Sequence, residues 1–460
     1  MRDLLFSSVM AVLLPLCFVH PWMGILVWSW LGYLNPHQHC HSLAKWYIPW
    51  AQMVALATLA GLMFTRDRKP FIWCRESFLM ILLWIWFTVT TLFAWYPEDA
   101  WWQWERVSKV LLMNFLTIPL IRDRNRMRWL LLVIAGSLGF YGFKGGLFVI
   151  ATGGSYLVNG APGNTSISAN NAIALALNMC LPLFWYLRKD EPRRWLRNAL
   201  TATFFLSALA VPFTYSRAGL LGLGCVLTLL FVRSRYRYLA LPLLGVAAVL
   251  LFAFAPKKWV ERMETITSYN EDASAVTRLL AWDVGKRIAD DSPFVGGGFW
   301  VFNQQQTWAR YAPGFPSAPD AHSIYYNMLG EHGYVGLGLF LLLMFFTLMR
   351  VLSLFLAGRQ YKETSWISDY AFMLGVGLVA YLVNGAFLSV PYFDLAWHFL
   401  ALVVVLNELA AQEFKILAPV RAPRSIAQSR PVSFPKLPVP AGTGYRRILN
   451  TAVASSRRDM

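Results

Sequence analysis

Residues 333–357 have the sequence GYVGLGLFLLLMFFTLMRVLSLFLA, in which Arg350 is the only charged residue. A helix crosses the hydrocarbon core of a membrane with about 20 mostly apolar residues. This stretch is long enough for one crossing, and a chain that contains such a helix has lipid as part of its solvent. It therefore predicts an integral membrane protein.

The composition of the whole chain agrees with that prediction. Of the 460 residues, 57% are hydrophobic and 14% are charged, whereas about 25% are charged in a typical soluble protein. A soluble domain of this size cannot bury so much apolar surface in one core. The composition excludes a soluble enzyme, a disordered chain and a free nucleic-acid-binding protein. The formal net charge of +17 is then first a signal of membrane orientation.

Similar apolar runs recur along the chain and predict an all-α integral membrane protein with about twelve membrane-spanning helices. The first run, 4–34, contains Pro15 and Pro21 and is expected to make a single crossing with an interfacial extension. The others lie at roughly 46–64, 77–95, 107–121, 129–151, 169–187, 198–215, 218–232, 239–255, 333–357, 371–390 and 396–411.

Clusters of Arg and Lys predict the orientation. Successive clusters, such as Arg122–Arg128 and Arg188–Arg197, are separated by two predicted spans and therefore lie on one side, which the positive-inside rule makes cytoplasmic. Both termini are then cytoplasmic. The predicted parts are a membrane region 1–255, a periplasmic loop 256–332, C-terminal spans 333–411, and a basic Pro/Arg-rich tail 412–460 that is expected to be disordered.

The long loop carries seven Lys and Arg against nine Asp and Glu, so it is not a general polyanion-binding surface. Its sequence predicts one helix over Ser274–Ile288, capped by Ser274, and another from His322 to Leu329, capped by Asp320. The glycine run Gly296–Gly298 lacks the Lys-Ser/Thr of a P-loop, which argues against nucleotide binding.

Three residues of the predicted outer face are candidates for chemistry. The imidazole of His322 can take a proton from a sugar hydroxyl near neutral pH, the alternative being a structural histidine at a helix end. Arg217 lies in a very short outer connection and suits a phosphate, the alternatives being a lipid-phosphate anchor or an ion pair. Arg278 shares a helix face with Trp282 and Gly285, which suits contact with the membrane domain, whereas a solvated charge is the alternative.

Other polar residues carry weaker predictions. Lys144 is expected to reach the outer interface from within a span, and Asn170 either caps a helix or contacts a ligand. The run that includes His37, His39 and His41 has spacings that fit no known closed metal site, so neither a metal nor a cofactor is predicted. His332 lies ten residues after His322 and is expected to face elsewhere, where it packs or snorkels at the interface.

Several motifs follow one another from the predicted outer face to the start of the span 333–357. They are Ser216-Arg217-Ala218-Gly219, Arg278 with Trp282, Gly296-Gly297-Gly298, Ala321-His322-Ser323 and Glu331-His332-Gly333-Tyr334-Val335-Gly336. Their order resembles the O-antigen ligase and O-antigen polymerase superfamily of bacterial inner-membrane glycosyltransferases. The start of the chain, from Met1 to His37, is similar to the N-terminal region of O-glycosylation ligases associated with exosortase systems.

This resemblance implies a twelve-span fold of the glycosyltransferase-C type and transfer of a glycan from undecaprenyl diphosphate to an acceptor hydroxyl, without a metal. It implies that His322 is the general base and that Arg217 and Arg278 hold the diphosphate. The chemistry is consistent, because the periplasm supplies no nucleotide sugar and a leaving diphosphate needs cations aimed at it. Attack opposite the leaving group predicts inversion at the anomeric carbon.

The sequence indicates the identity of the acceptor less narrowly than that of the donor. Lipid A-core oligosaccharide is favoured, which predicts an O-antigen ligase that meets membrane lipid and no nucleic acid. The alternatives that use the same donor are an O-antigen polymerase and a protein O-oligosaccharyltransferase. A transporter of lipid-linked glycans is an alternative of another class, although such proteins often have repeated halves and this sequence shows no repeat.

Overall fold

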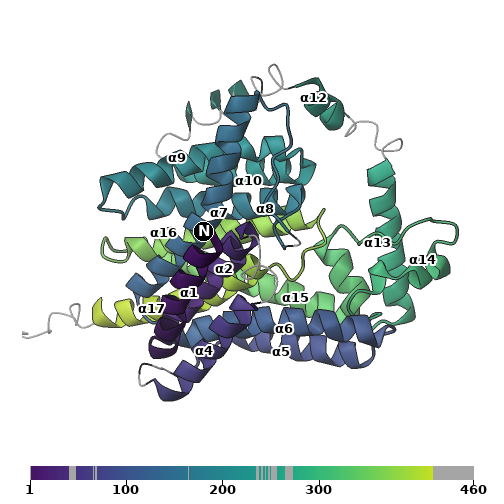
Figure 1. The fold of residues 1–460 in the computed structure, drawn as a ribbon, viewed down its shortest axis with the longest axis horizontal. Helices are drawn as coiled ribbons and strands as arrows, with labels where there is room; N and C mark the ends of the chain where they lie inside the picture. Colours follow the sequence, from purple (N-terminus) through teal and green to yellow (C-terminus); the bar gives the residue numbers. More distant parts are fainter. Residues whose placement is uncertain are drawn as a thin grey trace, which may run out of the picture. The chain divides into compact units, whose positions relative to one another are not determined.

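A computed structural model describes residues 2–40, 48–65, 67, 70–163, 165–234, 238–239, 242–243, 245–246, 249, 256–264 and 273–417. Within these ranges the regular elements are helices, and there is no strand (Figure 1). Seven of the helices are long and apolar enough to cross a membrane. They are α1 (Arg2–Val19), α5 (Arg75–Leu92), α7 (Arg124–Thr152), α8 (Asn170–Leu187), α15 (Ile324–Ala357), α16 (Ser365–Gly385) and α17 (Asp394–Leu417).

Of the other predicted spans, one corresponds to two helices, four correspond to single helices, and one lies mostly outside the described residues. The stretch 4–34 forms α1 and a second helix, α2, which begins at Pro21 directly after His20. Four further runs form the helices α4, α6, α9 and α10. The predicted span 239–255 and the tail from residue 418 lie mostly or wholly outside the described residues. The remaining elements are α2 (Pro21–Leu34), η1 (Pro36–His39), α4 (Trp50–Phe64), α6 (Pro97–Leu120), α9 (Arg194–Ala210), η2 (Pro212–Thr214), α10 (Arg217–Arg233), α12 (Lys257–Glu264), α13 (Ala273–Asp291), η3 (Val301–Asn303) and α14 (Gln305–Tyr311).

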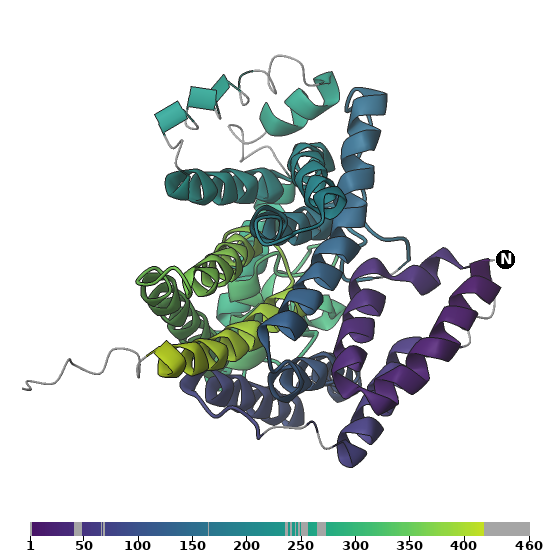
Figure 2. The same cartoon turned by 90° about the vertical axis from the view of Figure 1, so that its left-hand side faces the viewer.

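The described residues up to Phe414 form one compact unit, and its most buried long helices are α8, α17 and α16. Helix α8 is buried along most of its length and is packed by α7, α9, α10 and α16. Small residues allow these helices to approach closely, as membrane helices do; a Cβ on Gly219 of α10 would meet the Cβ of Ala174 at 2.7 Å. Helices α1, α2 and α4 pack on one another (Figure 2), and α2 joins them to the rest of the unit by packing on α7 and α6.

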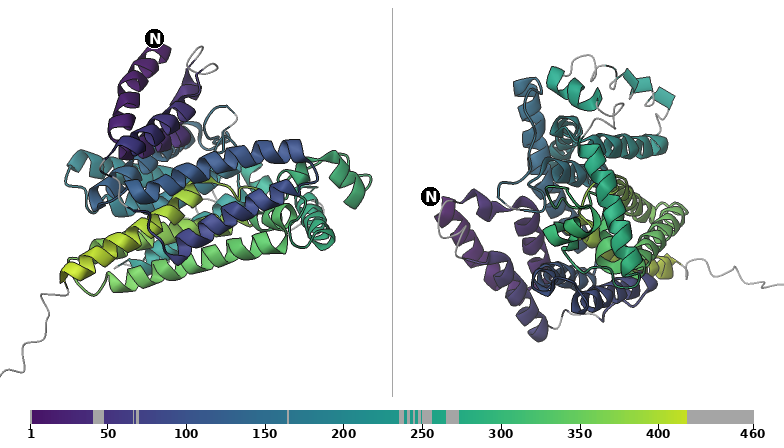
Figure 3. Two further views of the ribbon diagram at one scale, coloured as in Figure 1. Left: turned by 90° about the horizontal axis from the view of Figure 1, so that it is seen from below. Right: turned by 90° about the vertical axis from the view of Figure 1, so that its right-hand side faces the viewer.

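The helix that contains the most apolar stretch also includes most of the short helix that the sequence predicts before it. Helix α15 starts at Ile324 with Ser323 as its N-cap, so the prediction of a start at His322 capped by Asp320 is wrong. It also continues past Leu329, through a single non-helical residue, Gly333 (φ 67°, ψ −172°), to Ala357. Figure 3 shows this long helix in light green.

The glycine run of the loop docks at this break. The amides of Gly297 and Gly298 donate to the carbonyls of Gly330 and Glu331 (2.8 and 3.0 Å), and the amide of Tyr334 donates to Pro293 (2.8 Å). A Cβ on Gly333 would lie 2.3 Å from the carbonyl oxygen of Phe294. The run therefore satisfies main-chain groups that the break exposes. Upstream, α13 already includes Ala273, so the predicted cap at Ser274 is wrong.

Candidate active site at the start of α15

The backbone of His322 is held in an uncommon conformation directly before α15. Its φ of 49° lies in the left-handed region, which costs about 1–3 kcal/mol for a residue other than glycine and is concentrated at functional sites. Two contacts fix the chain there: the amide of His322 donates to Oγ of Ser389 (2.6 Å), and Nε1 of Trp282 donates to the carbonyl of Ala321 (3.0 Å). The imidazole itself is half-buried.

Arg278 lies close enough to His322 for its charge to act on the imidazole. Burial first, and then the positive charge of Arg278, lower the pKa of His322. The ring is therefore neutral at pH 7, which is the form that accepts a proton. The helix face of Arg278 packs on α15, as the sequence spacing predicts: Trp282 stacks on Tyr326 with ring centroids 5.0 Å apart, and Gly285 leaves room for Phe302.

Arg217 is the first residue of α10 and is half-buried. Its predecessors make a tight turn, in which Tyr215 is left-handed (φ 56°) and Oγ of Ser216 accepts from the amide of Gly219 (3.0 Å). The turn is covered by α12, because Nε1 of Trp259 donates to the carbonyl of Pro212 (2.9 Å).

The start of α10 and the His322 backbone are tied to the same end of α16. The side-chain amide of Asn178 donates to the carbonyl of Gly219 (2.9 Å) and to Oδ1 of Asn384 (3.3 Å), near the end of α16. The chain then leaves α16 and reaches Ser389, which holds His322. The structure thus brings Arg278 within electrostatic range of His322 and joins Arg217 to the same region through α16.

The comparison with family models bears on this region. Residues 202–341, which include Arg217, Arg278 and His322, match a family described as O-antigen ligase. This match over part of the chain supports the O-antigen ligase and polymerase superfamily. Residues 1–191 match a family of unknown function, DUF5935. A search of curated proteins gives no match. The matched family implies a glycosyltransferase-like enzyme, and the long apolar helices indicate a multi-pass membrane protein.

A network of buried hydrogen bonds lies behind the site, and the sequence did not predict it. His332 is fully buried and packed, and it contacts Oγ1 of Thr90 (2.7 Å) and the hydroxyl of Tyr392 (2.5 Å). That hydroxyl donates to Oε2 of Glu331 (2.5 Å), whose other oxygen accepts from the amide of Trp300 (2.9 Å). The network fastens the connection between α16 and α17, which also carries Ser389, to α15.

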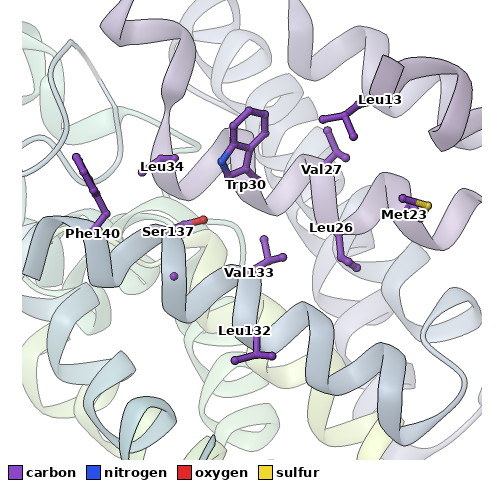
Figure 4. Close-up of a pocket in the computed structure, with 11 residues that line it drawn as sticks. Leu13, Met23, Leu26, Val27, Trp30, Leu34, Leu132, Val133, Ser137 and Phe140 are labelled. Atoms are coloured by element: carbon purple, nitrogen blue, oxygen red, sulfur yellow. The ribbon is translucent and has the colours of Figure 1, made fainter. Parts of the chain in front are cut away.

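Two pockets lie beside the N-terminal helices. One, of about 500 Å³, is apolar and lies between α1, α2 and α7. Leu13, Trp30 and Phe140 are among its lining residues (Figure 4). The other, of about 420 Å³, is polar and reaches Tyr392 and Asp394 beside the buried network.

The remaining polar candidates have mainly structural surroundings. The amide of Asn170 donates to the carbonyl of Thr214 (2.9 Å), while Ala169 is the N-cap of α8, so Asn170 ties two segments together and does not cap the helix. Lys144 is exposed on α7. His39 lies 3.4 Å from the hydroxyl of Tyr141, and His41 is outside the described residues. Over the described ranges, no three His, Cys, Asp or Glu side chains are grouped to hold a metal.

Replacing Ser389 by Ala is expected to lower kcat by about 3- to 10-fold, because the variant loses one hydrogen bond that holds His322. The acid limb of the pH profile should stay in place, since the imidazole and its charged neighbour are unchanged. Ser389→Thr keeps the hydroxyl and should restore the rate. A wild-type rate in Ser389→Ala, or a failure of Ser389→Thr to rescue, would contradict this positioning role.

Proposed function

We propose that this protein transfers an O-antigen glycan from undecaprenyl diphosphate to a hydroxyl of lipid A-core oligosaccharide on the periplasmic face of the bacterial inner membrane. The pairing of a neutral imidazole with a guanidinium carries the proposal. His322 and Arg278 come from separate parts of the matched segment, and Trp282, on the same helix as Arg278, bonds the residue before His322, which leaves the charge of Arg278 able to act on the imidazole. Such a pair suits a reaction in which a hydroxyl loses a proton while an anion leaves.

In the proposed reaction, His322 takes the proton of the acceptor hydroxyl as its oxygen attacks the anomeric carbon. A new glycosidic bond forms, the bond from that carbon to the diphosphate oxygen breaks, and undecaprenyl diphosphate leaves with the electron pair. Arg217 and Arg278 stabilise the developing negative charge, because a guanidinium forms bidentate hydrogen bonds with phosphate oxygens. The imidazolium then returns its proton to water. Attack from the face opposite the diphosphate inverts the anomeric centre.

Two arginines take the place of a divalent cation in this proposal, and no cofactor takes part. The alternatives that share the donor differ only in the acceptor: a second lipid-linked glycan for a polymerase, or a protein hydroxyl for a protein O-oligosaccharyltransferase. The N-terminal resemblance to exosortase-associated ligases favours keeping the protein acceptor among them. A transporter would move the lipid-linked glycan without breaking the bond to diphosphate.

Purified protein incubated with lipid-linked glycan and each acceptor in turn tests the proposal. Extension of the lipid A-core, with release of undecaprenyl diphosphate and in the presence of a chelator, is the expected product. A product only on the lipid-linked glycan or on protein would replace the ligase by one of its alternatives. An absence of bond cleavage with all acceptors would contradict the transferase, and a requirement for a divalent cation would contradict the metal-free mechanism.

The pH profile of transfer should report His322. Because burial and Arg278 lower its pKa, kcat/KM should be level around pH 7 and fall only as the pH drops below the ordinary histidine value of about 6.5. Arg278→Gln removes a positive charge, so the pKa of His322 rises and the acid limb moves to higher pH. Arg287→Gln, on the same helix in an exposed pair with Asp283, is the matched control and should leave the limb unmoved. An acid limb that stays fixed in Arg278→Gln would refute the coupling.

A further inference from the structure

We propose that the polar pocket between α2, α6 and the connection from α16 to α17 is a carbohydrate-binding site. The inference deepens the proposed function, on which it rests for the identity of the glycans. The pocket has a volume of about 420 Å³ and is lined by residues from separate segments, among them Trp28, His37, Gln103, Thr165, Tyr392 and Asp394. It does not contain His322, Arg217 or Arg278.

Three of the lining residues carry buried polar atoms that lack a hydrogen-bond partner within the described parts of the chain. They are Nδ1 of His37, Oε1 of Gln103 and Oγ1 of Thr165. Buried polar atoms are almost always paired, because an unpaired one forfeits its hydrogen bonds to water. Three such atoms from η1, α6 and the segment before α8 line one pocket, which indicates a polar occupant that supplies the missing bonds.

The chemistry of the lining favours a polyol. The oxygen of Gln103 only accepts, whereas the hydroxyl of Thr165 donates and accepts. Burial, and then the charge of His39, lower the pKa of His37, so its ring is neutral and has one accepting and one donating nitrogen. Sugar hydroxyls offer both roles at short spacing. The lining also includes the carboxyl group of Asp394, which accepts from Asn114 (3.0 Å), and the cationic side chain of Arg106. The pocket therefore has no excess of positive charge that would select a diphosphate, and Trp28 offers a flat apolar surface.

The pocket adjoins the candidate active site through one short segment. Tyr392 lines the pocket, and Ser389 holds the backbone of His322. Three residue steps separate them, which limits their Cα atoms to at most about 11 Å apart. A glycan that extends from the reacting group at His322 is therefore long enough to span this distance with a few sugar units, whether it belongs to the donor or to the acceptor.

The test uses the full-length protein in detergent and the double variant Gln103→Leu/Thr165→Val, which removes two of the unpaired atoms with little change in volume. Calorimetry would measure binding of two lipid-free probes: core oligosaccharide released from lipid A, and glycan released from the lipid-linked donor. We expect the wild type to bind one of them and the double variant to bind it at least about tenfold more weakly. The apparent KM for the corresponding substrate should rise by a similar factor, with kcat little changed.

Ser207→Ala is the matched control, because it also removes a buried unpaired hydroxyl but lies where α9 meets α7. It should bind as the wild type does, and so should His322→Ala, since binding needs no chemistry. Wild-type binding without any transfer activity would refute the proposed function and keep the pocket. No binding of either probe by the wild type, or equal binding by the double variant, would mean that water alone fills the pocket and would overturn the inference. The probe that binds identifies donor or acceptor.

Discussion

Replacing His322 by Ala is expected to reduce kcat by about 10²–10⁴-fold, because the acceptor hydroxyl then has no positioned base. The measurement is formation of glycosylated acceptor by purified protein at saturating donor. The protein should still insert and accumulate as the wild type does, since the imidazole is half-buried at a helix start and is not part of the core.

A second variant separates the imidazole from the backbone that carries it. His322→Asn removes the base, yet asparagine adopts the left-handed conformation more readily than alanine does. Both variants should therefore lose transfer to a similar extent. His20→Ala, at the exposed junction of α1 and α2, is the matched control and should keep full activity. Wild-type turnover in either His322 variant would remove this residue from the mechanism.

The second large effect is expected at Arg217. Arg217→Lys keeps the charge but loses the planar pair of donors that matches a phosphate, so the loss of kcat should reach about 10²–10³-fold, as when one preorganised donor to a developing anion is removed. Arg194→Lys, an exposed residue at the start of α9, is the control and should be neutral. A rate within twofold of the wild type in Arg217→Lys would show that position 217 contributes no directed hydrogen bonds to the leaving group.

The membrane helices were predictable because each one is specified by the composition of its own continuous stretch of sequence. An apolar run such as 333–357 specifies a helix by its own composition, and the spacing of Arg278, Trp282 and Gly285 specifies one face. The predicted start of α15 failed because the preference of a single residue at a helix end is weak. The left-handed backbone of His322 depends on contacts with Ser389 and with Trp282, which are distant in the chain.

The buried network and the polar pocket could not be predicted from the sequence either, because both are formed by residues that are distant in the chain. Tyr392 meets Glu331 across 61 positions, and the polar pocket is assembled from η1, α6 and the connection before α17. Nothing in the neighbourhood of Gln103 or Thr165 marks them as unpaired, because that property arises only when helices pack. The cluster of arginine and histidine could be proposed from the family resemblance, whereas its supports could not.

The interrupted helix α15 has a consequence for how this protein can change over evolutionary time. The loop is fastened near Gly333 largely by main-chain amide and carbonyl groups, at glycines where a Cβ would not fit. Residues farther along the loop can thus be exchanged without weakening its attachment to α15 at Gly333. Substitutions in that part of the loop can change the substrate preference, while the position of His322 relative to the membrane helices stays constant.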